Sequence, residues 1–179
     1  MARRALGIAA AVSSALILAA CGDSGVVDQE GSSLTPTTGV ATPTEEPESF
    51  ETHSAEPLTT DQINGKVVED PGMDVSYKWQ GATYAPNGGT VVTVAVMNHS
   101  DNIMPPEALG EPELKYKGGK EKASRMSAEE AGIETDGLDL PLGKGATMNV
   151  QYAFDVSTGN LSDATFKIGN VVFEGNLNN

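Results

Sequence analysis

The C-terminal two thirds of the chain contain runs in which hydrophobic and polar residues alternate, the pattern of a half-buried β-strand. Residues 147–156, TMNVQYAFDV, carry apolar side chains at every second position. Residues 89–98, GTVVTVAVMN, place three valines on one face and threonine, alanine and methionine on the other. We therefore predict a half-buried strand in the first run and a strand with both faces partly covered in the second.

Shorter runs predict further strands and the turns between them. Residues 73–84 supply one or two strands, and residues 113–117 form a short strand that turns at the glycine pair 118–119. The sequence LGKG at 142–145 has turn chemistry. A Gly-Asn pair at 169–170 separates two apolar runs and predicts a tight hairpin or a bulge.

One helical signal occurs among these strands. Ser127 followed three residues later by Glu130 matches the capping-box pattern, and Gly132 provides a stop, so a single helical turn is expected. Six or seven short strands joined by turns predict an all-β fold, an antiparallel β-sandwich.

The N-terminus has a different pattern, a basic start followed by one apolar run. Arg3 and Arg4 precede about 14 apolar or small residues at 5–18, too few to span a bilayer, which takes about 20. This arrangement is typical of an export signal. The run ends in Leu-Ala-Ala-Cys, which resembles the lipobox of bacterial lipoproteins and makes Cys21 the predicted lipidation site.

Cleavage before Cys21 would leave a lipid anchor on the extracytoplasmic face of the cell membrane, where two acyl chains give stable attachment. The alternatives are an ordinary cleaved signal with an incidental cysteine, or an uncleaved helix. Because Cys21 is the only cysteine, the folded domain can form no internal disulfide.

Composition divides the remainder into a tether and a domain. Residues 21–61 are rich in Ser, Thr, Pro and Glu, with nine acidic and no basic residues, and predict a disordered acidic tether after the signal peptide at 1–20. Residues 62–179 form the predicted domain. The whole chain has a formal net charge of −14, which argues against nucleic acid as a partner.

The domain also resembles a known family. A strand ending in Asn at 92–98, the LGKG turn, a strand ending in Phe-Asp-Val at 154–156 and a closing hairpin are similar to a family of bacterial cell-envelope lipoproteins. These resemble the secreted immunoglobulin-like antigens of actinobacteria. The resemblance implies an immunoglobulin-like β-sandwich, without an assigned activity.

A basic run stands out in this acidic chain. It consists of five cations around the glycine pair 118–119: Lys115, Lys117, Lys120, Lys122 and Arg125. Such a patch would attract an anionic partner, either an envelope polymer, lipid headgroups or an acidic protein. The competing interpretation is a solvated hairpin whose lysines point outward.

The spacing of the candidate metal ligands matches no known metal site. Met97, His99 and Met104 have copper-type donors, but the simpler interpretation is that Met97 packs while His99 and Met104 lie on a loop. Two clusters of oxygen-bearing side chains are candidate calcium ligands: Glu134, Asp136 and Asp139, and Asp155, Asn160 and Asp163. They lack the ligand spacing of an EF-hand, and the same residue types are common in turns. We expect no metal and no cofactor.

No catalytic motif accompanies these residues. A Ser-His-Asp triad around His99 would need a serine supplied by the fold, and the sequence contains no nucleophile elbow. The sequence predicts a lipid-anchored, extracytoplasmic, non-catalytic binding or interaction module. The alternative is a small-ligand or metal-binding carrier of the envelope, and a hydrolytic enzyme is the weakest hypothesis.

Overall fold

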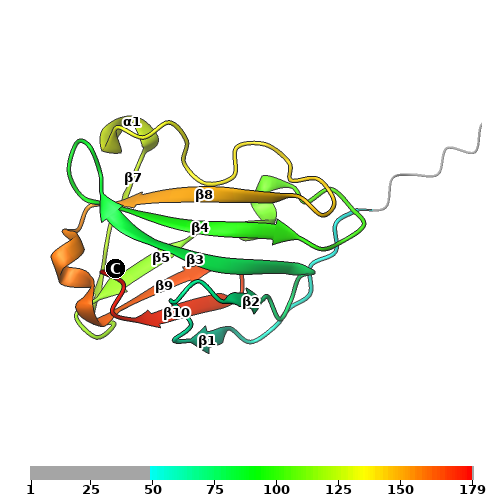
Figure 1. The fold of residues 1–179 in the computed structure, drawn as a ribbon, viewed down its shortest axis with the longest axis horizontal. Helices are drawn as coiled ribbons and strands as arrows, with labels where there is room; N and C mark the ends of the chain where they lie inside the picture. The colour runs from blue at the N-terminus through cyan, green and yellow to red at the C-terminus, as the bar shows by residue number, and fades with distance from the viewer. Residues whose placement is uncertain (1–48, 179) are drawn as a thin grey trace, which may run out of the picture. The chain divides into compact units, whose positions relative to one another are not determined.

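The computed structural model describes residues 49–178 (Figure 1). This part of the chain contains ten β-strands, one α-helical turn and two 3₁₀-helices, η1 (Pro106–Leu109) and η2 (Thr158–Asp163). Cys21, the predicted signal peptide and most of the predicted tether lie outside the described residues. No helix among residues 49–178 is long and apolar enough to cross a membrane.

The strands form two five-stranded sheets packed as a sandwich. The first sheet has the order β1 (Leu58–Thr60), β10 (Val171–Gly175), β9 (Ala164–Ile168), β5 (Glu113–Tyr116) and β6 (Glu121–Lys122). The second has the order β2 (Val67–Glu69), β3 (Val75–Tyr84), β4 (Thr90–Asn98), β8 (Thr147–Phe154) and β7 (Arg125–Met126). Neighbouring strands are antiparallel, except that β1 runs parallel to β10. The predicted β-sandwich is confirmed at this level.

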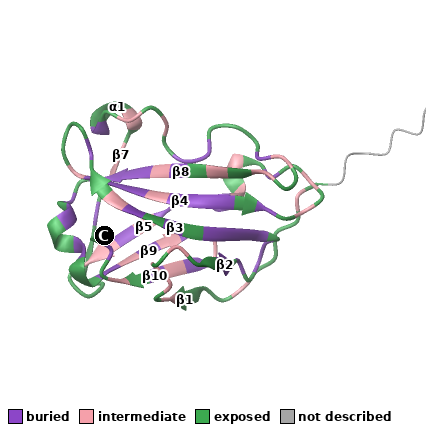
Figure 2. Cartoon of the chain, viewed as in Figure 1, coloured by how far each residue is buried: buried purple, intermediate pink, exposed green. Residues whose placement is uncertain are grey.

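The core lies between the two sheets and contains aromatic side chains from both. Trp79 of β3 packs against Phe166 of β9 and Phe173 of β10, with ring centroids 5.9 and 5.6 Å apart. Phe154 of β8 meets Phe166 edge-on at 6.1 Å. Figure 2 shows buried residues running along β3 and β4. Because this core has no disulfide, its packing carries the stability of the domain.

The alternation in the sequence predicts which residues face the core. Val150 and Phe154 of β8 are fully buried, and Tyr152 is 5% exposed. Both faces of β4 are covered, as expected: its Val91 joins a small second cluster with Ala85, Ala131 and Ala153. This second cluster includes the last residue of α1 (Ala128–Ala131).

The local signals for helix and turns are also confirmed. The Ser127 hydroxyl accepts a hydrogen bond from the Glu130 amide at 3.3 Å, and the Glu130 carboxylate accepts one from the Ser127 amide at 2.8 Å. Gly132 ends the helical turn in the left-handed region at φ 73°. The glycines at 118–119 turn β5 into β6, and residues 169–170 turn β9 into β10.

A buried carboxylate ties the start of the domain to the β9–β10 hairpin. Asp70 accepts hydrogen bonds from the Gly72 amide, the Tyr77 hydroxyl, and the amide and side chain of Asn170, at 2.8 to 3.0 Å. Burial, together with the neighbouring Asp70 carboxylate, raises the pKa of Tyr77 above its ordinary value. The Tyr77 hydroxyl therefore remains a donor to Asp70.

Ordered structure begins before residue 62, within the segment that composition assigns to the tether. Residues 58–60 form β1, which pairs with β10, and the Leu58 amide donates to the Asn170 carbonyl at 2.8 Å. Phe50 packs against the main core. These contacts offset the entropy cost of ordering a polar segment whose composition alone favours a coil.

Candidate functional site

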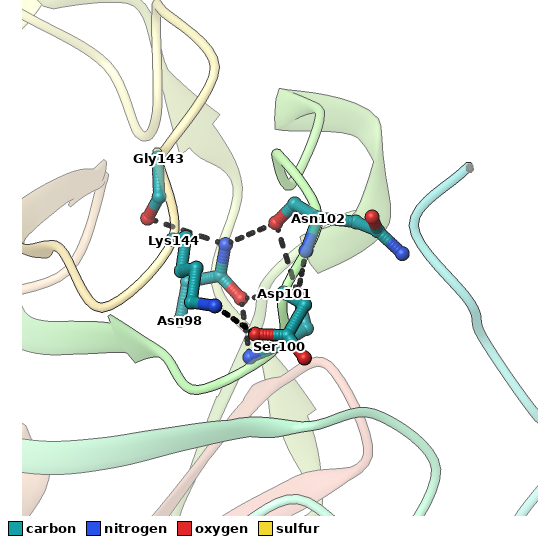
Figure 3. Close-up of polar contacts among 6 residues, drawn as sticks. All are labelled: Asn98, Ser100, Asp101, Asn102, Gly143 and Lys144. Carbon is teal, nitrogen blue, oxygen red and sulfur yellow. Dashed lines mark hydrogen bonds and ion pairs between the residues drawn. The ribbon is translucent and has the colours of Figure 1, made fainter. Parts of the chain in front are cut away.

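One end of the sandwich is built around the side chain of Asn98, the last residue of β4 (Figure 3). This fully buried side chain donates from Nδ2 to the carbonyls of Asn102 (2.8 Å), Leu142 (3.0 Å) and Gly143 (3.3 Å). Its Oδ1 accepts from the amide and hydroxyl of Ser100 at 3.0 and 2.7 Å. A single side chain thus joins two loops that are 44 residues apart in the sequence.

Two further contacts connect these loops. Met104 and Leu142 form an isolated antiparallel bridge with reciprocal backbone hydrogen bonds of 2.9 Å. Lys144 pairs with Asp101, and this hydrogen-bonded ion pair lowers the pKa of the Asp101 carboxyl. We call the two joined loops, residues 98–105 and 139–145, the loop platform.

The loop platform exposes large apolar side chains. Ile103 is 64% exposed and Leu140 is 68% exposed. Each lies within two residues of the Met104–Leu142 bridge, and Pro105 and Pro141 are exposed beside them. Single exposed hydrophobic residues are ordinary. Here two of them lie on loops that are joined by the Met104–Leu142 bridge, and exposed apolar residues on such loops are available for recognition.

The platform adjoins the start of the described chain and a small cleft. The Asn102 side chain donates to the Ser49 carbonyl at 3.3 Å. A cleft of about 290 Å³ is lined by residues that follow these segments in the chain, 52–53 and Glu107 of η1, and by residues 169–170 of the β9–β10 turn. The apolar surface, the cleft and the incoming chain therefore share one end of the domain.

Sequence patterns gave little indication of this site. Asn98-His99-Ser100 has the form of a glycosylation motif or of a turn. Asn followed two residues later by Ser is an Asx-turn signal, which the Ser100 amide bond confirms. Nothing local indicates that the Asn98 side chain also reaches a second loop.

The predicted basic patch lies on β5, β6, β7 and the turns between them, and local acids pair with most of it. Lys115 and Lys122 both bind the Glu113 carboxylate, at 2.7 and 2.6 Å. Their hydrogen bonds lower the pKa of Glu113 to about 2. Lys117 pairs with Glu121 at 2.9 Å. This pairing reduces the positive field of the patch without cancelling it, because the five cations outnumber the three acids that pair with them.

Arg125, the fifth cation of that patch, is part of the domain's packing. Its guanidinium pairs with Asp136 and lies over the rings of Tyr152 and Phe154, 4.9 and 5.2 Å from their centroids. Burial raises the pKa of Tyr152 to about 12. In the described part of the chain, Lys120 is the only member of the patch without an ion pair.

His99 lies beside a serine and a glutamate, but not as a catalytic triad. Its Nε2 is 2.7 Å from the Ser76 hydroxyl and 3.8 Å from the Glu69 carboxylate. In a triad the nucleophile and the orienting acid use different ring nitrogens. Here both partners share Nε2, so Glu69 does not orient the ring for proton transfer from Ser76.

The candidate metal ligands are not assembled. Met97 is 37% exposed, so the expectation that it packs was wrong. Met104 lies on a loop as expected, but its side chain is fully buried in the core. The physical reason is the bridge to Leu142, which holds Met104 against the core. Residues 49–178 contain no group of three His, Cys, Asp or Glu side chains able to hold a metal ion, and this includes both acidic clusters considered for calcium.

A wider pocket lies near the β5–β6 turn. It has a volume of about 470 Å³ and is lined by Asp61, Asp163, Glu174 and the glycines at 118–119. Small-molecule pockets are mostly lined by apolar and aromatic side chains with a few polar groups. This one has three carboxylates and no aromatic side chain, and it suits a cation better than an apolar ligand.

Comparisons of the chain with protein-family models, with curated proteins and with solved structures gave no match. The resemblance to immunoglobulin-like envelope lipoproteins therefore rests on the sequence motifs alone. Function is inferred from the residues and geometry of the chain itself.

Proposed function

We propose that this protein is a lipid-anchored interaction module on the extracytoplasmic face of a bacterial cell membrane, and that it binds a protein partner without catalysing a reaction. The observation that carries the binding role is the loop platform, where exposed Ile103 and Leu140 stand on loops braced by the buried Asn98 side chain. Preorganised loops lose little conformational entropy on binding, so more of the contact energy contributes to affinity.

We further propose that the sandwich is immunoglobulin-like. The strand order β3-β4-β8-β7 opposite β10-β9-β5-β6 corresponds to the orders A-B-E-D and G-F-C-C′ of immunoglobulin domains. The chain also crosses between sheets after β4 and after β8, as it does in those domains. Trp79 departs from the antibody pattern, because it lies on β3 rather than on the strand equivalent to C. Immunoglobulin-like domains commonly use end loops for recognition, which fits the position of the platform.

Replacing Cys21 by Ala tests the anchor in the full chain. The substitution removes the thiol that takes the lipid, so the protein should move from the membrane fraction to the soluble fraction and lose incorporation of labelled palmitate. Ser24→Ala, three residues downstream, is the matched control and should remain in the membrane. Unchanged membrane retention of Cys21→Ala would contradict the anchor.

Photo-crosslinking in intact cells tests the binding role. A photoreactive amino acid at position 103 or 140 of the full-length protein should give discrete crosslinks to a protein. The same amino acid at Tyr84, which is 73% exposed near the β3–β4 hairpin at the other end of the domain, is the control (Figure 1). Equal crosslinking at all three positions, or none at 103 and 140, would refute recognition through the platform.

The second candidate function is a carrier for a small cationic ligand, and the acidic pocket near the β5–β6 turn favours it. A ligand at about 100 times its dissociation constant would add about 2.7 kcal/mol of stability. Thermal unfolding of the full chain with a series of polyamines measures this effect. A shift that disappears in Asp163→Asn would support the carrier, and no shift with any of these probes would remove it.

A further inference from the structure

We infer that the partner bound at the loop platform is a basic protein surface, in which apolar residues that contact Ile103 and Leu140 are flanked by lysine or arginine. This inference rests on the proposed binding role of the platform and identifies the chemistry of the partner. Two observations support this inference: the charge around the platform and the size of the cleft lined by Glu107.

The charges around the platform are predominantly negative. Glu107 and Asp139 are exposed beside Pro105 and Leu140, and neither forms an ion pair within residues 49–178. The one lysine of the platform, Lys144, is already paired with Asp101. The apolar surface therefore has an acidic rim, which is complementary to cations on a partner.

The cleft beside the platform suits one long basic side chain. Its volume of about 290 Å³, at the lower limit of the roughly 300–1,000 Å³ of small-molecule sites, is sufficient for one long side chain. Glu107 lines it and supplies an unpaired carboxylate, and Asn170 also contributes to its wall. A lysine or arginine that enters would gain a charge-assisted hydrogen bond to Glu107.

The same charges disfavour two other occupants. Residues 62–179 carry 16 acidic and nine basic side chains, so a second copy would bring its own acidic rim against the first. An anionic membrane surface would meet Glu107 and Asp139 with charge of the same sign. A basic protein surface satisfies both the apolar and the acidic parts of this end of the domain.

The test uses the full-length, membrane-bound protein with a photoreactive residue at position 140. Glu107→Gln combined with Asp139→Asn removes the acidic rim, and we expect crosslinking to fall by about tenfold, the effect of losing one charge-assisted contact. Glu129→Gln with Asp155→Asn, at two exposed acids away from the platform and from both pockets, is the matched control and should leave crosslinking unchanged. Thermal unfolding checks that both double variants remain folded, which their exposed positions favour.

Mass spectrometry of the crosslinked peptide gives the second readout. Lysine or arginine next to the crosslinked apolar residue, together with the loss in the rim variant, supports the inference. Crosslinks at positions 103 and 140 that are equally strong in the rim variant and in the parent would overturn the inference and leave the binding role intact. Crosslinks to lipid or to a second copy would also overturn it. Absence of any crosslink at 103 and 140 would overturn both the inference and the proposed binding role.

Discussion

Asn98 supports two loops with one buried side chain, which makes it the residue whose loss should matter most at the platform. Asn98→Ala would leave the buried Leu142 carbonyl without its side-chain donor and would release the Ser100 amide. The substitution removes several hydrogen bonds, each with a net contribution of about 0.5–1.5 kcal/mol, while the Leu142 carbonyl keeps its bond from the Met104 amide. We expect the free energy of unfolding to fall by about 2–3 kcal/mol in urea titrations.

Asn160→Ala is the control for this substitution. Asn160 lies in the other Asn-x-Ser sequence and is exposed, so its replacement should change stability by less than about 0.5 kcal/mol. If the two variants lost equal stability, Asn98 would not be the centre of the platform.

Glu113 should give the domain a pH-dependent contribution to stability. Its ordinary pKa of 4.5 falls to about 2 in the folded protein, because Lys115 and Lys122 donate hydrogen bonds to it. A carboxyl with a depressed folded pKa contributes stability above its unfolded pKa and loses it as pH falls through the folded value. Stability should therefore decrease between about pH 4.5 and 2, and Glu113→Gln should flatten that part of the profile.

Urea unfolding at several pH values measures this dependence. Glu129→Gln, in the exposed first turn of α1, provides a control with the same change of charge. Because Glu113 is partly exposed, the change should be small and should shrink further in high salt. A profile of Glu113→Gln that matches the parent would show that these ion pairs contribute nothing measurable.

At the residue scale, the sequence predicted the features that depend on residues close to one another in the chain. Alternation identified Val150 and Phe154 as core residues. It did not show that Asp136 would meet Arg125, since that contact depends on how a loop folds back beside β7. The basic run was visible in the sequence, but the pairing of four of its cations with three acids was not.

At the element scale, Gly169 tests the hairpin that closes the first sheet. It has φ 53°, and a Cβ there would clash with the Tyr77 hydroxyl and lie 2.6 Å from Asp70 Oδ2. Gly169→Ala should therefore break the hydrogen bond between Tyr77 and Asp70 as well as strain the backbone. We expect a loss of about 3 kcal/mol or more in unfolding free energy, from strain and the disrupted buried bond together.

Gly119→Ala separates these two effects. Gly119 has φ 76°, but the position that a methyl group would take there has no atom of a more distant residue within 4 Å. Alanine at this position therefore adds backbone strain alone, about 1–2 kcal/mol. If both variants lost the same unfolding free energy, the hydrogen bonds to the Asp70 carboxylate would not depend on the close approach of Gly169. Urea unfolding of both variants gives the comparison.

Hairpins and the helical turn were predictable because their signals are contiguous. The Gly-Asn pair at 169–170 and the Ser127 capping box both specify local backbone geometry. The pairing of β5 with β9, and of β1 with β10, joins segments distant in sequence and follows from the shared core. β1 has only three residues and lies in polar sequence, so no periodicity marks it.

At the scale of the molecule, the two-sheet architecture was predictable and the candidate site was not. Repeated short strands favour a sandwich whatever their exact pairing. The loop platform exists only because Met104 and Leu142 meet after folding, and each is followed or preceded by proline in sequence typical of a loop. The acids beside it, Glu107 and Asp139, also come from separate segments of the chain.

The N-terminal limit of the domain is the last feature that can be tested at this scale. A chain beginning at residue 62 lacks β1, the hydrogen bond from the His53 amide to the Gly72 carbonyl and the packing of Phe50. Strand hydrogen bonds and partial burial of one aromatic ring outweigh the ordering cost by a small margin. We expect this chain to be about 1–3 kcal/mol less stable than one beginning at residue 49.

A chain beginning at residue 22 is the matched control, and it should be as stable as the chain beginning at 49 if residues 22–48 act as a tether. Urea unfolding of the three chains distinguishes two limits for the domain. Equal stability of all three would place the limit at residue 62, as composition alone predicts. A loss confined to the shortest chain would make residues 49–61 part of the folded unit, and the loop platform would then contact at Ser49 the same segment that leads to the proposed anchor.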